Sequence, residues 1–385
     1  MFARKREHIF PWVGISALSI VFVGMTGWIW FLADSGYRPN EGQLTSDENT
    51  KTYLRVKFAE TDRPLPELIP TGVFIQSLRF NNSNEVNITG YLWQRYPGSV
   101  DPDTCEEENI CGFVFPEAVD TGSNIIPRRE YVRRTRDETV IGWYFESTLR
   151  QQFKYDRYPL DHKTVWIRMW HKNFESSYLL IPDLGAYKGT GVTNKFGYDQ
   201  EIVLGNWVID DTFFDFKWFH YDTNFGLAPK YADRPSNPEL YFNVVIRRNF
   251  LNTFVVHLVP LLTVAILLFS MLLLITDDEK KAGVLGFSTS GIIGVCASLF
   301  FVIMLAHVQL REQFAGARIV YMEFFYLTMY VLIIGVAANT YLFSLKLGTK
   351  TWFGNFIYHR ENLIPKTLYW PVLTGSIVLF SLWLI

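Results

Sequence analysis

Acidic side chains and two cysteines gather in one short segment of this sequence, where they could bind a cation or form a cross-link. Cys105 and Cys111 flank an acidic loop and would form a disulfide in an oxidising compartment; two free thiols are the alternative. Asp101, Asp103 and Glu107 lie in the same segment, and Ca²⁺ binds several oxygen ligands. A modulating calcium ion is one interpretation of these acids. A solvated loop is the other, because their spacing differs from that of an EF-hand.

Motifs of known enzyme classes are absent from the sequence. It contains no CxxC pair, HExxH, GxSxG or Walker loop, and no nucleophile–base pair or metal cluster stands out. We therefore expect no enzymatic activity and no obligatory cofactor. The 36 Lys and Arg residues nearly balance the 38 Asp and Glu residues, and no basic patch is dense enough to predict a nucleic-acid partner.

Four long uncharged stretches fill the last third of the chain. A helix of about 20 residues crosses a hydrocarbon core about 30 Å thick, and each stretch is about that long or longer. We therefore expect a four-helix transmembrane domain over residues 250–385. The stretches are Leu251–Ile275, Ala282–Ala306, Ile319–Phe343 and Thr367–Ile385.

A fifth apolar stretch, Ile9–Ala33, follows three basic residues at the N-terminus. It is either a cleaved signal peptide or an uncleaved anchor over residues 1–34. Its length and its flanking Trp12 and Trp28 favour the anchor. Both interpretations place the N-terminus in the cytoplasm and the next segment outside. The basic residues of the later loops follow the same orientation, so we expect a multi-pass membrane protein.

The segment between the N-terminal stretch and the four later ones has the pattern of β-strands. Val86, Ile88 and Leu92 alternate with polar or aromatic residues, and several such runs are separated by turn residues. This pattern predicts an antiparallel β-sandwich over residues 69–249, outside the membrane. Residues 35–68 are polar and poorly patterned, and we interpret them as a linker. The expected fold is thus a β-sandwich on a four-helix transmembrane bundle, with an extra N-terminal hydrophobic helix.

The second uncharged stretch differs from the others because small and polar residues dominate it. Gly286, Ser290, Gly294 and Ser298 fall four apart, on one stripe of a helix. Close helix packing is one explanation, and the polar lining of a pore shared by several copies is the other. The acidic run Asp277–Glu279 precedes the stretch. It would form rings of charge in such an assembly, or it is solvated charge at a helix N-terminus.

Two faces of this stretch could line the pore. One runs through Thr289, Ile293, Cys296 and Phe300, and the other through Gly286, Ser290, Ile293 and Ala297. Bulky residues further along, Phe300 and Met304 among them, could form a hydrophobic constriction.

Three sequence patterns follow one another along the chain. They are Tyr91-Leu92-Trp93-Gln94-Arg95-Tyr96, Tyr158-Pro159-Leu160-Asp161, and Arg247-Arg248 directly before a helix that carries Pro260. In this order, with four apolar helices, they resemble the pentameric ligand-gated ion channels (the Cys-loop receptor superfamily), and the bacterial branch in particular. The similarity covers roughly Pro70 to Ile385. No cysteines flank the second pattern, where eukaryotic members carry a disulfide, which fits a prokaryotic member.

The resemblance implies a homopentamer in a bacterial inner membrane, with a periplasmic head that binds a small molecule, a divalent cation or protons. It implies cation selectivity from an acidic residue before the second helix, for which we choose Glu279. The pore candidates are then Glu279, Gly286, Thr289, Ser290, Ile293, Ala297, Phe300 and Met304. The implied coupling residues are Tyr158, Pro159, Leu160, Asp161, Arg247 and Arg248, with an ion pair between Asp161 and Arg247.

The resemblance also implies a ligand site between neighbouring heads, lined by aromatic side chains, whose faces attract ammonium groups. The candidates are Tyr91, Trp93, Trp143, Phe145, Tyr178, Tyr221 and Tyr231, and ordinary packing is the alternative for each. A second function is a non-conducting membrane sensor that passes a solute signal to a partner protein. A small-residue stripe buried within one subunit would favour the sensor, and a stripe left open would favour the channel.

Overall fold

The computed structural model of the protein describes residues 2–36, 42–60, 64–119, 125–174, 178–189, 195–223, 225–226, 238–286, 288–314, 318–346, 352–359 and 361–385. The chain divides into two compact units. The helical unit comprises Met1–Gly36, Lys154–Asp161 and Asn249–Ile385. The β-rich unit comprises Tyr37–Phe153 and His162–Arg248.

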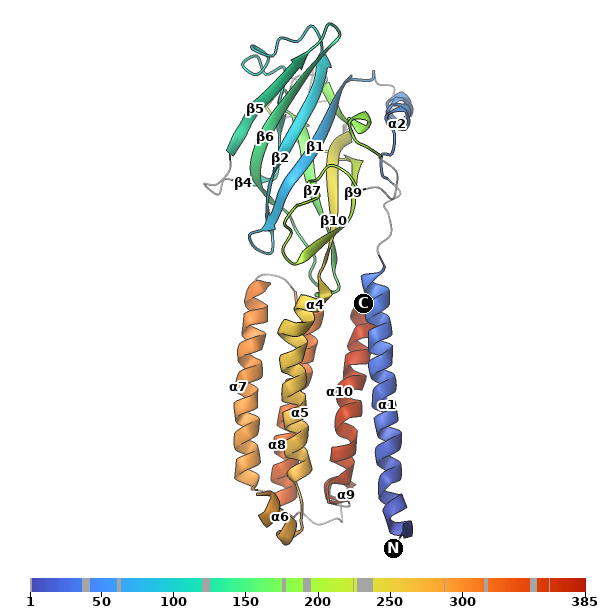
Figure 1. Ribbon diagram of the computed structural model, residues 1–385, viewed down its shortest axis with the longest axis vertical. Coiled ribbons are helices and arrows are strands. Elements are labelled where there is room, and N and C mark those ends of the chain that lie inside the picture. Colours follow the sequence, from blue (N-terminus) through green and yellow to red (C-terminus); the bar gives the residue numbers. More distant parts are fainter. Residues whose placement is uncertain are drawn as a thin grey trace. The chain divides into compact units, whose positions relative to one another are not determined.

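Two β-sheets build the β-rich unit (Figure 1). The first sheet has the order β4-β6-β2-β1-β8, with β5 paired to β6, and the second has the order β3-β7-β10-β9. The first sheet contains β1 (Glu67–Phe80), β2 (Glu85–Pro97), β4 (Ala118–Val119), β5 (Ile125–Arg134), β6 (Glu138–Arg150) and β8 (Tyr178–Pro182). The second contains β3 (Phe113–Val114), β7 (His162–His171), β9 (Trp207–Trp218) and β10 (Pro238–Arg248).

The sheets share one hydrophobic core, and the predicted alternation explains it. Ile88 and Leu92 of β2 are fully buried, whereas Trp93, the residue after Leu92, points to the opposite face and is half-buried. Phe242 and Val244 bring the second sheet into the same core. Burying one such side chain stabilises a fold by about 1.5–3 kcal/mol. The alternation therefore largely determines which face of each strand packs into the core.

The predicted linker over residues 35–68 is wrong in part, because it contains the helix α2 (Asp47–Glu60). Thr50, Leu54 and Phe58 lie four apart on the buried face of α2. Leu54 and Phe58 pack against Leu179 and Ile181 of β8. Polar residues separate these three positions in the sequence, so the segment has little overall hydropathy although one face is apolar.

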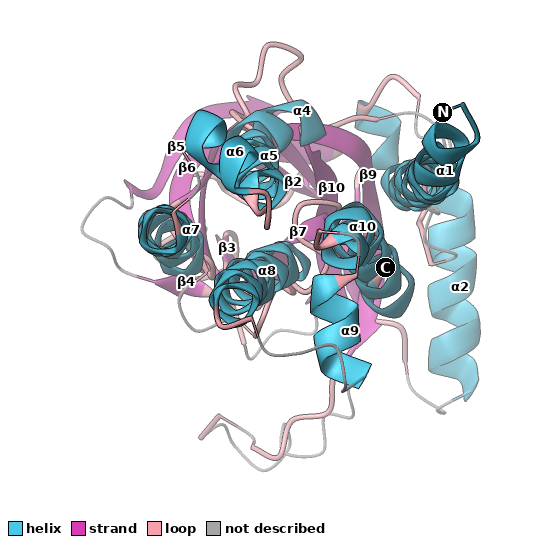
Figure 2. Ribbon diagram, turned by 90° about the horizontal axis from the view of Figure 1, so that it is seen from below, coloured by secondary structure: helices cyan, strands magenta, loops and turns pink. Residues whose placement is uncertain are grey.

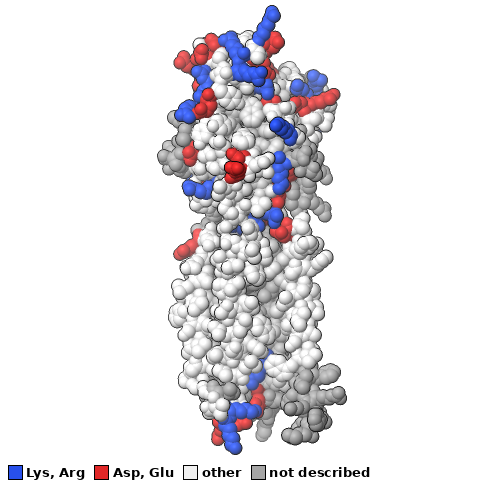
Figure 3. Space-filling view, viewed as in Figure 1, with Lys and Arg blue, Asp and Glu red and all other residues white. Residues whose placement is uncertain are grey.

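Five described helices are long and apolar enough to cross a membrane. Their apolar spans are Trp12–Asp34 in α1 (Phe2–Asp34), Phe250–Leu274, Thr289–Gln313, Tyr321–Ser344 and Leu363–Leu384. In the view of Figure 3, the helical unit carries its charged residues near its two ends, and uncharged side chains cover most of the length between. These findings are compatible with a multi-pass membrane protein.

The helices contact one another around α8 (Tyr321–Ser344), which touches α5 (Val259–Leu274), α7 (Thr289–Gln313) and α10 (Leu363–Leu384). The N-terminal helix α1 packs beside α10 (Figure 2). The Trp30 indole of α1 donates a hydrogen bond of 2.8 Å to the Tyr321 hydroxyl, which lies 2.6 Å from the Ser381 hydroxyl of α10. The short helix α9 (Trp352–Tyr358) precedes α10.

The apolar span Phe250–Leu274 changes its helical winding near its start. It runs through α4 (Phe250–Thr253), a π-helical turn η2 (Phe254–Leu258) and α5. Pro260 has no backbone N–H, so it cannot donate the hydrogen bond that would continue a regular helix, and local π winding accommodates this loss.

The second predicted span is interrupted, which corrects the expectation of one stretch over Ala282–Ala306. The short helix α6 (Glu279–Leu285) ends at Gly286, whose φ of +67° is left-handed and favours glycine. A new helix, α7, starts at Thr289, and the Ser288 side chain caps it by accepting a 2.9 Å hydrogen bond from the Gly291 amide.

Candidate functional site

Helix α7 has one face packed within the chain and one face left open. Ile292, Cys296, Leu299 and Ile303 are buried, and α7 contacts α8 and α5. The opposite face is exposed, and it begins with the small residues Ser290, Gly294 and Ala297. Further along it becomes bulky, with Phe301, Leu305 and Val308.

The structure distinguishes the two predicted pore faces. The face through Cys296 is wrong, because Cys296 is 2% exposed and the Phe300 ring lies 5.3 Å from the Tyr330 ring of α8. Ser290, Ile293 and Ala297 of the second face are exposed. Gly286 lies outside α7, at the end of α6. Thr289 and Met304 are half-buried.

The small residues of α6 and α7 do not serve close packing within the described chain. A Cβ atom added to Gly283, Gly286 or Gly294 would meet no described atom within 4 Å, apart from its chain neighbours and its own helix backbone. Close helix packing would bring a neighbouring backbone against these positions. The stripe is therefore open in the single protomer.

The acidic run before α6 is partly occupied with local contacts. Asp278 caps α6 by accepting hydrogen bonds from the Lys280 and Lys281 amides, and Asp277 lies 3.6 Å from the Lys346 ammonium. Glu279, in the first turn of α6, is exposed. Of the three acids, Glu279 is thus the one whose carboxylate has neither the capping contact nor this lysine.

The turn between β6 and β7 belongs to the helical unit. The Tyr155 and Tyr158 rings lie 4.9 and 4.5 Å from the Phe314 ring at the end of α7. The Tyr158 hydroxyl is 3.2 Å from Nε2 of His257 in η2, and Nδ1 of His257 is 3.3 Å from the Tyr326 hydroxyl of α8. Pro159, Leu160 and Asp161 are also buried.

A second histidine continues this group of buried polar contacts. His307 of α7 stacks on the Tyr326 ring at 5.2 Å, and its Nε2 lies 3.5 Å from the Glu323 carboxylate of α8. Glu323 also accepts a 2.7 Å hydrogen bond from the Val320 amide and pairs with Arg311 at 3.3 Å. We call Tyr158, His257, Tyr326, His307 and Glu323 the histidine chain.

The two predicted coupling arginines lie in the β-rich unit. Arg247 pairs with Asp210 at 2.9 Å, and the Arg248 guanidinium lies 4.1 Å from the Trp207 ring centre. The pairing of Arg247 with Asp161 stays a prediction. Asp210 was not among the coupling candidates, because the pairing of an acid with an arginine on the neighbouring strand leaves no local pattern in the sequence.

An aromatic cleft of 560 Å³ opens on the outer face of the first sheet. Tyr91 and Trp93 of β2, two of the predicted ligand residues, lie on one wall together with Phe74 of β1 and Tyr131 of β5. The opposite wall comes from the loop segments on either side of residues 190–194. It comprises Ala186, Tyr187, Lys188, Lys195, Phe196, Gly197, Tyr198 and Gln200.

A separate aromatic group covers the outer face of the second sheet, and we call it the Trp170 cluster. Tyr221, a predicted ligand residue, lies 5.9 Å from Trp170 and 5.5 Å from Phe225, and Phe174 lies 5.6 Å from Trp170. The guanidinium of Arg168 is 4.9 Å from the Trp170 ring centre.

Acids surround Arg168 beside this cluster. Its side chain lies 3.2 Å from Glu117 and 3.4 Å from Glu239, and the Tyr221 hydroxyl donates to Glu239. Burial raises the pKa of Glu117, and the charge of Arg168 offsets part of this shift. The cluster therefore already contains a cation of the protein over an aromatic face, where the resemblance implied the ammonium of a ligand.

The remaining ligand candidates are distributed differently from the expectation. Trp143 and Phe145 are 2% and 1% exposed, in the core, on the opposite face of the sheet from Tyr91 and Trp93. Their assignment to a ligand wall is wrong, because Leu92 is the cross-strand partner of Trp143 and both point inward. Tyr178 is half-buried, with its ring 4.8 Å from the His171 ring. Tyr231 lies outside the described residues.

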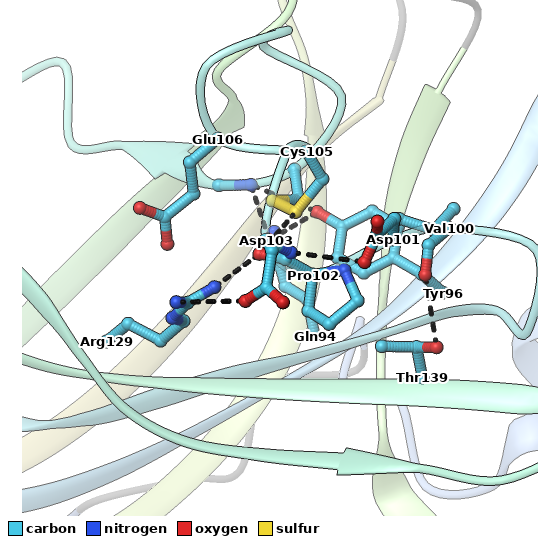
Figure 4. Close-up of a disulfide and its surroundings, with 12 residues drawn as sticks. Gln94, Tyr96, Val100, Asp101, Pro102, Asp103, Cys105, Glu106, Arg129 and Thr139 are labelled. Carbon is cyan, nitrogen blue, oxygen red and sulfur yellow. Dashed lines mark hydrogen bonds and ion pairs between the residues drawn. A yellow bond between two sulfur atoms is a disulfide. The ribbon is translucent and has the colours of Figure 1, made fainter.

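Cys105 and Cys111 form a disulfide that holds the acidic loop (Figure 4). Asp103 lies 3.5 Å from Arg129, which also donates to the Pro102 carbonyl, and Asp101 lies 3.6 Å from Arg134. Arginines thus lie beside two of the three acids proposed to bind calcium, and the third, Glu107, is exposed. Among the described residues, no group of three or more His, Cys, Asp or Glu side chains is arranged to hold a metal ion.

Sequence reasoning missed several residues of these sites. Tyr131 and Trp170 were not candidates, although aromatic residues on strands were a usable signal. Lys188, Lys195 and Tyr198 come from a loop without periodicity, which no strand pattern could place.

A scan of protein-family models finds no match to the chain, and a search of curated proteins finds no relative.

Proposed function

We propose that this chain is one protomer of a homopentameric, cation-selective, ligand-gated ion channel, similar to the bacterial branch of the Cys-loop receptor superfamily. In this proposal the β-rich unit is a β-sandwich head in the periplasm. Helices α5, α7, α8 and α10 form the transmembrane bundle in the bacterial inner membrane, and α7 lines the pore.

The open small-residue face of α7 is the observation that carries this proposal. A helix that crosses lipid gains nothing from exposing Ser290, Gly294 and Ala297, whereas a shared aqueous axis accepts small and polar side chains. Identical copies related by rotation form a closed ring with the same interface repeated. The stripe is open rather than buried in the single subunit, which favours the channel over the non-conducting sensor.

The acid at the start of α6 supports cation selectivity. Glu279 is exposed, and five copies around an axis would form a ring of negative charge that concentrates cations. Asp277 and Asp278 have local contacts with Lys346 and with the α6 amides, so their charges are partly compensated.

The turn over Lys154–Asp161 supports coupling between ligand and pore. It is joined to β6 through residues 151–153 and continues directly into β7 of the β-rich unit, while its tyrosines contact the end of α7 and, through His257, the α8 helix. A displacement of these strands would thus reach the helices through a continuous chain of packed groups. The aromatic cleft and the Trp170 cluster lie on different sheets, so neighbouring heads in a ring could bring one of each together.

Reconstitution in liposomes tests the proposal. The purified protein should have five times the protomer mass of 44.8 kDa and should release K⁺ faster than Cl⁻. Glu279→Gln should lower the ratio of K⁺ to Cl⁻ flux, and the matched variant Asp277→Asn should change it much less. A stable oligomer that conducts no ions under any pH, divalent cation or small-molecule condition would contradict the channel and favour the sensor.

A further inference from the structure

The aromatic wall of the cleft rests on an unusual line of residues across four neighbouring strands. Gly72 of β1 pairs with Trp93 of β2, Trp93 pairs with Gly142 of β6, and Gly142 pairs with Tyr131 of β5. A Cβ atom at Gly72 would overlap the Trp93 ring, and one at Gly142 would overlap the Tyr131 ring. The two glycines thus leave room for each ring to lie against the sheet, and we call the Trp93 and Tyr131 rings the platform.

The orientation of the platform is fixed by polar contacts. The Trp93 indole donates a 2.8 Å hydrogen bond to Asp183, and Arg95 pairs with the same carboxylate at 2.7 Å. Tyr131 is 45% exposed, so a ligand can reach its ring. A preformed, partly exposed aromatic surface binds a flat ring without the cost of ordering it first.

The opposite wall is held by hydrogen bonds to β1. The Tyr187 hydroxyl lies 2.7 Å from the Val73 amide and 2.9 Å from the Val73 carbonyl. The Gly197 carbonyl accepts from the Ile75 amide at 2.8 Å, and the Asp199 amide donates to the Ile75 carbonyl at 2.8 Å. The cleft is therefore built into the fold on both sides.

The charge of the cleft selects the sign of the ligand. Lys188 and Lys195 are among the described lining residues, and no Asp or Glu is. The Lys195 ammonium also donates to the Ile209 carbonyl, which holds it in place. The nearby carboxylate of Asp183 is engaged by Arg95 and Trp93. An ammonium ligand would meet two like charges, whereas a carboxylate would meet two opposite ones.

We propose that the aromatic cleft binds a flat, ring-bearing organic anion, with the ring on Trp93 and Tyr131 and the anionic group toward Lys188 and Lys195. This inference rests on the proposed function only in taking ligand binding at the head as the gating event. It replaces the ammonium ligand implied by the resemblance with a ligand of opposite charge.

Two probes with the same ring and opposite charge test the inference. Indole-3-acetate and tryptamine are titrated into the purified full-length protein by calorimetry, so that no ion flux is needed. Indole-3-acetate should bind at least about tenfold more tightly than tryptamine. The double variant Lys188→Gln/Lys195→Gln should remove this preference, and Trp93→Ala should weaken both probes. Lys51→Gln, on the exposed face of α2, should bind like the wild type.

Equal or tighter binding of tryptamine would overturn the inference, as would failure of wild-type protein with a normal melting temperature to bind indole-3-acetate. An anion preference that survives in a double variant with a normal melting temperature would also overturn it. The outcome is separable from the channel proposal. Anion binding without ion flux would leave the ligand class standing and reject the channel, and flux without anion binding would do the reverse.

Discussion

Helices α7 and α8 have similar length and both are apolar, yet they use their surfaces differently. In the most apolar part of α8, half of the residues are buried within the protomer, against 22% in the most apolar part of α7. Helix α8 contacts α5, α7, α9 and α10 and is hydrogen-bonded to α1, and its Tyr326 and Glu323 belong to the histidine chain. The more open helix is thus the one with small and polar residues, while the packed helix has bulky ones.

Exposure alone does not indicate a pore, as α1 demonstrates. Only 6% of the most apolar part of α1 is buried, less than for α7, and its open positions include the bulky Ile20, Val23 and Phe31 as well as Gly24 and Gly27. Bulky apolar side chains suit lipid. The open face with Ser290, Gly294 and Ala297 therefore separates α7 from the more buried α8, whereas α1 differs from α7 chiefly in how little of it is packed within the protomer.

A bulky residue on each helix would produce the largest expected difference. Gly294 of α7 and Gly335 of α8 both have no described atom within 4 Å of an added Cβ, apart from their own helix backbone and chain neighbours. We expect Gly294→Trp to lose nearly all ion flux, because five indoles would fill a common axis. Gly335→Trp should keep the flux, because its ring would point to lipid. Flux assays on liposomes with equal amounts of oligomer measure both, and equal fluxes would show that α7 has no special face.

One acid near the end of α7 and one near the start of α8 show the same contrast between an open and a packed helix. Glu323 of α8 is buried and accepts from Val320 and Arg311, whereas Glu312 of α7 is exposed. We expect Glu323→Gln to lower the stability of the helical unit by about 2 kcal/mol, because hydrogen bonds to a charged group are lost. Glu312→Gln should change it little. Denaturant titration in detergent measures both, and a negligible loss for Glu323→Gln would show that α8 is not the packing centre.

The smallest effect concerns the contact of α8 with α1. Trp30 donates to Tyr321, whereas Trp28 is 63% exposed. We expect Trp30→Phe to cost about 1 kcal/mol through the lost hydrogen bond, and Trp28→Phe to cost less. Thermal unfolding of the detergent-solubilised protein compares them. Identical melting curves for the two variants would argue against a specific contact between α1 and α8.

Much of the fold follows from local periodicity, and the misses have physical causes. The strand β2 alternates as predicted, because burial on one face of a sheet imposes a period of two. The predicted alternation of β10 is wrong in terms of burial, because Leu240 to Ile246 are all buried and both faces of this strand are covered. The α2 helix escaped because three apolar residues among polar ones leave a weak signal. The break at Gly286 escaped because a left-handed glycine has no hydropathy.

The candidate site was less predictable, because its residues meet only through register and loop placement. Trp143 was assigned to the wrong face, since aromatic residues occupy both faces of β6 and only cross-strand pairing with Leu92 decides between them. Tyr91 and Trp93 do lie in a cleft. The lysines beside them come from a loop whose path depends on hydrogen bonds to β1, which the sequence alone does not specify.

The most direct test of a shared aqueous axis is cysteine accessibility on the two helices. In a background where buried Cys296 is serine, Ala297→Cys on α7 is compared with Val331→Cys, a 69% exposed position of α8. A charged, water-soluble thiol reagent should modify Ala297→Cys in membranes and block ion flux, and it should leave Val331→Cys unmodified. An Ala297→Cys protein that stays unmodified, or that is modified without any change in flux, would contradict the account.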